Sequence, residues 1–112
     1  MSLLSFQKLT RSFNMILEWF NAGEAVSFAH EMVREINRLF PPSDRKGKAI
    51  PKKEYQRRFD TLVIRARAFS LKNRLNIYKK AKLLNTIKWE MKDAGHENEI
   101  INEFISFIAP LL

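Results

Sequence analysis

The sequence lacks cysteine and contains only three glycines and four prolines among its 112 residues. Without cysteine there is no disulfide framework, no thiolate nucleophile and no zinc site built on sulfur ligands. Glycine and proline are also too scarce for the many tight turns of an all-β sandwich. The absence of cysteine agrees with a reducing compartment, and we expect a cytoplasmic protein.

Long apolar runs are missing as well. In the first twenty residues the longest run is Met15–Leu17, and Lys8, Arg11 and Asn14 interrupt the segment before it. A signal peptide needs an unbroken apolar stretch of about 7–15 residues, and a membrane span needs about 20. We therefore expect neither a secretory leader nor a membrane partner.

Positive charge is abundant and unevenly distributed. Twenty Lys and Arg stand against twelve Asp and Glu, which gives a net charge of +8. Residues 1–40 are balanced, residues 41–92 hold sixteen basic and four acidic residues, and residues 93–112 hold four acidic residues and no base. The middle of the chain thus carries 16 − 4 = +12. A block of one sign favours a nucleic acid or an acidic protein as partner.

Apolar residues recur at helical spacing in five segments, at about 3–21, 24–40, 51–70, 74–94 and from Glu97 to Pro110. The short connection at Gly23 predicts that the first two segments form an antiparallel hairpin. We predict an all-α single domain over residues 1–112, a compact bundle of four or five helices with an N-terminal helical hairpin and an exposed basic loop at 41–50. Polar residues between 70 and 76 leave open whether 51–94 is one bent helix or two.

The same spacing predicts the core. The apolar stripes consist of Phe6, Leu9, Phe13, Ile16, Leu17, Phe20, Ala25, Ala29, Met32, Val33, Ile36, Leu39, Phe40, Tyr55, Phe59, Leu62, Val63, Ala66, Phe69, Ile77, Ala81, Leu84, Ile87, Met91, Ile100, Ile101, Phe104, Ile105 and Ile108, and we expect them to be buried. Ile64, Ala68 and Leu71 form a second apolar face on 51–70, and Met15 and Trp19 lie off the main stripe of 3–21. Either these two helices are central in the bundle or the protein forms a homodimer.

The basic block supplies the candidate binding residues. They are Arg45, Lys46 and Lys48 in the loop, Lys52, Lys53, Arg57, Arg58, Arg65 and Lys72 in 51–70, and Lys82 and Trp89 in 74–94. Each phosphate that such a surface neutralises adds affinity through counterion release. Our hypothesis is a non-catalytic nucleic-acid-associated binding protein. The alternative is a self-associating protein-interaction or regulatory adaptor whose basic face meets an acidic protein partner.

One pattern within 74–94 refines this hypothesis. Tyr78, Lys82, Asn85 and Trp89 follow an i, i+4, i+7, i+11 spacing that places them on one helix face. Alternating rings, cation and amide suit an unpaired base and its phosphate. The competing interpretation is that both rings pack against a neighbouring helix with their polar ends at the surface.

Signals for catalysis, metal or cofactor are weak. The two histidines, His30 and His96, do not form an HxxxH or HExxH pair, and we expect His30 to be partly buried and His96 to be solvated in a turn. Residues 45–48 lack the upstream glycine and hydroxyl residue of a Walker loop. A helix-turn-helix over 83–108 would bring three glutamates and no base to a phosphate-lined groove. We expect no enzymatic activity, no cofactor and no metal.

Overall fold

The computed structural model describes residues 17–42 and 50–112. Within these ranges it contains four α-helices and no strand: α2 (Gly23–Leu39), α3 (Lys52–Lys72), α4 (Ile77–Asp93) and α5 (Asn98–Ile108), followed by the short 3-10 helix η2 (Ala109–Leu111). The predicted all-helical bundle is confirmed. Most of the predicted helix 3–21, and with it the N-terminal hairpin, lies outside the described residues, as does most of the predicted loop 41–50.

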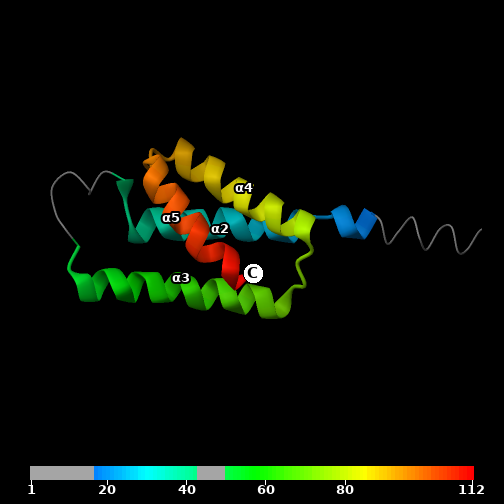
Figure 1. The fold of residues 1–112 in the computed structure, drawn as a ribbon, viewed down its shortest axis with the longest axis horizontal. Coiled ribbons are helices and arrows are strands. Elements are labelled where there is room, and N and C mark those ends of the chain that lie inside the picture. Colours follow the sequence, from blue (N-terminus) through cyan, green and yellow to red (C-terminus); the bar gives the residue numbers. More distant parts are fainter. Residues whose placement is uncertain (1–16, 43–49) are drawn as a thin grey trace, which may run out of the picture.

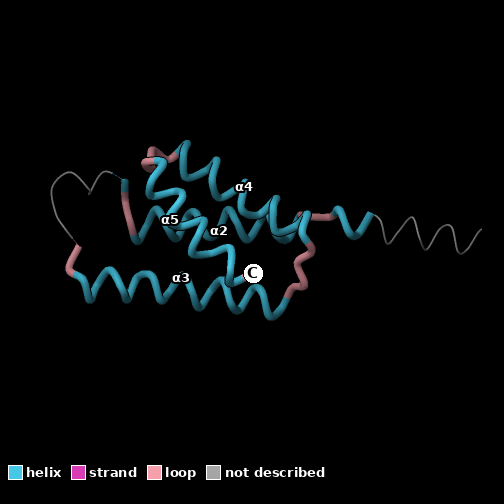
Figure 2. The backbone as a smooth tube through the Cα atoms, viewed as in Figure 1, coloured by secondary structure: helices cyan, strands magenta, loops and turns pink. Residues whose placement is uncertain are grey.

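α2, α3 and α4 run back and forth along the longest axis, and α5 crosses obliquely from the end of α4 toward α3 (Figures 1 and 2). α2 and α3 are antiparallel, and α4 returns along α2 to make the most extensive helix pair of the bundle. α5 folds back along α4 and brings η2 onto α3. Residues 17–20 form a helical turn beyond the N-terminal end of α2. The four helices therefore enclose one core and leave the outer face of each to solvent.

Most predicted core positions are buried, but α4 is rotated from its predicted orientation. Ile77 is 83% exposed and Ala81 is exposed, whereas the unpredicted Leu83 is fully buried with Ile87 and Met91. The prediction was wrong for Ile77 and Ala81, and also for Leu17 and Phe20 of the predicted stripe in 3–21, which are 54% and 52% exposed. Leu83, Ile87 and Met91 follow an i, i+4, i+8 stripe, and this stripe faces α2, the helix that α4 contacts most.

Aromatic rings join α2, α3 and α5. The ring of Phe59 on α3 stacks on that of Phe104 on α5, with centroids 5.0 Å apart and an interplanar angle of 8°. Phe40, after the end of α2, contacts both rings, at 5.3 Å from Phe59 and 5.4 Å from Phe104. Offset stacking and edge contacts are the geometries that aromatic quadrupoles prefer. This cluster holds the C-terminal helix against the rest of the bundle.

Two turns separate the last three helices. Asn73 has an extended backbone that ends α3, so 51–94 is two helices rather than one. Asn76 then caps α4, because its side-chain oxygen accepts a hydrogen bond from the Lys79 backbone N–H at 2.8 Å. After α4, Gly95 has a φ of +94°, which favours glycine and allows the sharp turn into α5.

Both histidines differ from expectation. His96 is buried, and its Nε2 hydrogen-bonds Asn37 Oδ1 on α2 at 2.6 Å. The prediction that His96 is solvated was wrong, because the turn at Gly95 directs it inward against α2. His30 is half exposed on α2, more than expected, and its Nδ1 forms an ion pair with the Glu90 carboxylate on α4.

Candidate nucleic-acid interface

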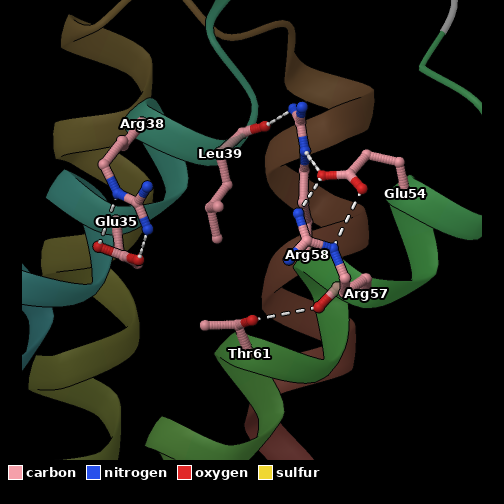
Figure 3. A network of polar contacts seen from close by, with 7 residues as sticks. All are labelled: Glu35, Arg38, Leu39, Glu54, Arg57, Arg58 and Thr61. Atoms are coloured by element: carbon pink, nitrogen blue, oxygen red, sulfur yellow. Dashed lines mark hydrogen bonds and ion pairs between the residues drawn. The ribbon is translucent and has the colours of Figure 1, made fainter.

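The predicted basic flank of α3 begins with a network centred on Glu54 (Figure 3). The Glu54 carboxylate accepts hydrogen bonds from Arg57, at 2.6 and 3.1 Å, and from Arg58 Nε at 3.1 Å. Arg58 also donates to the backbone carbonyl of Leu39 at the end of α2. Arg57 and then Arg58 hold the pKa of Glu54 at about 2, so that this carboxylate stays ionised between them. Both predicted phosphate ligands already have an anionic partner.

Carboxylates of α2 face the rest of this flank. Glu35 pairs with Arg38 on its own helix, and Arg38 lowers the pKa of Glu35 through this hydrogen bond. The charge of Arg65 on α3 lowers that pKa further, which brings Arg65 within the electrostatic reach of Glu35. Arg65 thus belongs to a surface of both signs.

Lys72, at the C-terminal end of α3, also lies near carboxylates. It lines a hollow of about 310 Å³ that also contains Glu18 and Glu24. An adjoining hollow brings in Glu31 of α2. The sequence could not reveal the carboxylates around Arg65 and Lys72, because Glu35, Glu18, Glu24 and Glu31 lie far from these bases along the chain. Phosphate binding by Arg57, Arg58, Arg65 and Lys72 stays a prediction. The surface around them is less positive than the count of basic and acidic residues in 41–92 indicates.

The remaining bases near the start of α3 are less constrained. Lys52 and Lys53 are exposed in its first turn and form no ion pair with another described residue. Arg45, Lys46 and Lys48 lie outside the described residues.

The outer face of α4 carries the predicted ring and cation pattern. Lys82, Asn85 and Trp89 are exposed, and the indole of Trp89 is 57% open to solvent. The Lys92 ammonium lies 5.4 Å from the Trp89 ring centroid, within cation–π range. Trp89 therefore does not pack into the described part of the bundle. The Lys92 ammonium lies over one face of the indole, and more than half of the Trp89 surface remains exposed.

Tyr78 behaves differently from Trp89. Its ring lies 5.0 Å from that of Phe20 and 6.0 Å from that of Trp19, both in the helical turn before α2. The packing interpretation therefore holds for Tyr78, although all three rings remain partly exposed. Sequence reasoning did not connect Trp19 and Phe20 with α4, because they are far apart in the chain. Lys92 belongs to the basic block of the sequence, but its contact with Trp89 was not predicted, although their i, i+3 spacing was visible.

Negative charge on α4 is sparse. Its carboxylates are Glu90, which pairs with His30, and Asp93 in the last turn. None of the α4 lysines forms an ion pair with another described residue. Lys79, at the start of α4, lines the same hollow as Glu18 and Glu24, so that the positive charge without a carboxylate in an ion pair or a shared hollow lies farther along the described helix, at Lys82, Lys88 and Lys92.

Searches for relatives and for other kinds of site add no further candidate. In the described part of the chain, no three His, Asp or Glu residues gather in a way that could hold a metal ion. No helix there is long and apolar enough to cross a membrane. Comparisons with protein-family models, curated protein sequences and solved structures gave no match.

Proposed function

We propose that this protein binds nucleic acid without catalysis, mainly through the outer face of α4. The observation that carries the proposal is Trp89, which is 57% exposed and has the Lys92 ammonium over its ring, on a helix whose lysines form no ion pair with the described residues. Stacking on an exposed indole contributes about 1–3 kcal/mol per base, and lysines add salt-dependent affinity for phosphate. Lys52 and Lys53 extend the positive surface onto α3. A cytoplasmic location, in keeping with the lack of cysteine, is part of the proposal.

Binding is tested by fluorescence anisotropy with labelled RNA and DNA oligonucleotides over a salt series. We expect micromolar or tighter binding at low salt and a linear fall of log K with log salt concentration. Lys82→Gln should reduce the slope by about 0.7 on a single strand or about 0.9 on B-form DNA. Arg57→Gln removes an equal charge from the Glu54 network and should change the slope less. Equal effects of both variants would assign the site to the whole basic block.

Trp89→Ala tests stacking separately from charge. The variant should lose about 1–3 kcal/mol of binding free energy with the salt slope nearly unchanged. Stability should change by no more than about 0.5 kcal/mol, since Trp89 is exposed. In a Trp19→Phe background Trp89 is the remaining tryptophan, because the chain has two, and its fluorescence then reports stacking directly. Absence of binding to any nucleic acid at low salt would defeat the proposal.

A second candidate function is a self-associating adaptor that meets an acidic protein. A specific observation favours it: Ile64 and Leu71 on the outer face of α3 are 68% and 89% exposed. Large apolar side chains one heptad apart on a helix face are typical of a docking surface. Analytical ultracentrifugation of the wild type and of an Ile64→Ser, Leu71→Ser double variant tests this function. A dimer that the double variant abolishes would support it, and monomers at all concentrations would contradict self-association.

A further inference from the structure

A second group of rings lies at the other end of the α4 face. The rings of Trp19 and Phe20 contact each other at 4.9 Å and both contact Tyr78 on the first turn of α4. A hydrogen bond of 2.8 Å from Asn76 Nδ2 to the Trp19 carbonyl joins this turn to the start of α4. Trp19 and Phe20 are 45% and 52% exposed, so the cluster is fixed by its contacts and yet accessible.

The spacing of the two ring sites follows from helix geometry. Tyr78 and Trp89 are eleven positions apart in the sequence, or about three turns, so that they share one side of α4. At 1.5 Å per residue they are separated by about 16 Å along the helix axis. Lys82 and Asn85 lie between them on that side, both exposed. At 3.4 Å per nucleotide, as in a stacked strand, this separation corresponds to about five nucleotides.

We infer that the α4 face is a two-platform site for single-stranded nucleic acid. This inference rests on the proposed function and deepens it. One base stacks on Trp89 and a second, about five nucleotides along, stacks on the cluster of Trp19, Phe20 and Tyr78, while Lys82 holds a phosphate between them. Single strands expose the faces of their bases, which duplexes keep stacked within the helix. Carboxylates of an acidic protein could form ion pairs with the lysines, but they would not stack on the aromatic rings.

The site predicts a dependence on strand length. In anisotropy competition with unlabelled oligouridylates or oligothymidylates of two to ten nucleotides, affinity should rise sharply as the strand reaches about six nucleotides, the shortest strand with two bases five steps apart. Tyr78→Ser should weaken binding of a ten-nucleotide strand about tenfold or more, as expected for a lost stacking contact. It should leave binding of a two-nucleotide strand to the Trp89 platform nearly unchanged. Ile77→Ser, which alters a neighbouring and more exposed apolar residue outside the ring cluster, is the matched control and should bind like the wild type.

Circular dichroism and denaturant midpoints of each variant establish that its fold is retained. If binding of the long strand depends on Trp89 but not on Tyr78, and affinity does not rise near six nucleotides, the two-platform site is overturned and the proposed function is left intact. Duplex binding as tight as single-strand binding would also overturn it. Failure of all lengths to bind at low salt would instead refute the proposed function. Self-association that Tyr78→Ser abolishes, with no nucleic-acid binding, would make the ring cluster an interface between copies.

Discussion

Phe59 on α3 and Phe104 on α5 stack almost in parallel, and both are buried at the centre of the aromatic cluster. Neither ring touches solvent to any useful extent, so that the contact serves the fold rather than a ligand. Phe59→Ala should lower the free energy of unfolding by about 3–5 kcal/mol, because it deletes a ring and leaves a cavity. Ile64→Ala on the exposed side of α3 is the control, with an expected change within about 0.5 kcal/mol. Urea denaturation measures both, and similar losses would contradict this orientation of α3.

The cap of α4 gives a second test. Asn76→Ala removes the side-chain acceptor of the Lys79 N–H and the donor to the Trp19 carbonyl. We expect a loss of about 0.5–2 kcal/mol in unfolding free energy. Asn85→Ala changes the same residue type in the exposed middle of the helix and should be neutral or slightly stabilising, because alanine favours helix. A cap variant as stable as the wild type in thermal and urea unfolding would refute the capping role.

Glu54 should make stability depend on acid pH. Its pKa in the folded protein is about 2, below the ordinary value of 4.5, because Arg57 and Arg58 hydrogen-bond the ionised form. A lowered folded-state pKa stabilises the fold above pH 4.5, and this contribution is lost as the pH falls from 4.5 towards 2. The wild type should therefore lose more stability over that range than Glu54→Gln. Glu99→Gln, on the exposed start of α5, should follow the wild type. Parallel curves for wild type and Glu54→Gln would contradict the ion-pair network.

The buried histidine can be tested through its partner. Asn37→Ala removes the oxygen that lies 2.6 Å from His96 Nε2 and leaves that nitrogen without this partner. The unfolding free energy should fall by about 1–3 kcal/mol, the cost of an unsatisfied buried polar group. Asn102→Ala, at an exposed position of α5, should change stability little. Comparable stabilities of the two variants in urea would show that a solvent molecule replaces Asn37 without cost.

Local sequence patterns predicted much of the fold. Pro41 and Gly95 mark the ends of α2 and α4 to within a few residues, whereas the polar residues between 70 and 76 left open whether α3 and α4 are separate helices. The rotation of α4 was not predictable from its own sequence, because Ile77 and Leu83 offered two competing apolar stripes. The choice between them is made by α2, which packs on Leu83. His96 was mispredicted for the same reason, since Asn37 lies on another helix.

In the candidate site, too, one part could be predicted from the sequence and another part depends on the tertiary fold. The i, i+4, i+7, i+11 pattern correctly placed Lys82, Asn85 and Trp89 on one helix face, because helical spacing alone determines it, but it left open whether that face is exposed. Whether the basic residues of α3 form ion pairs depends on which carboxylates lie near them. Glu54 was visible at i+3 and i+4 from its arginines, but the carboxylates of α2 reach this flank only through the tertiary fold. A charge count therefore located the basic helices without distinguishing paired from unpaired bases.

The glycine turn between α4 and α5 has a consequence for the order in which the helices dock during folding. Only residues 94–97 separate α4 from α5, whereas residues 40–76 must be closed into a loop before α4 can meet α2. Loop closure costs more entropy for the longer segment, so we expect the α4–α5 pair to form first and α2 to dock later. Gly95→Ala, which strains a residue at a φ of +94°, should then slow refolding more than it accelerates unfolding. In a chevron plot, an unchanged refolding rate with faster unfolding would place this turn after the rate-limiting step.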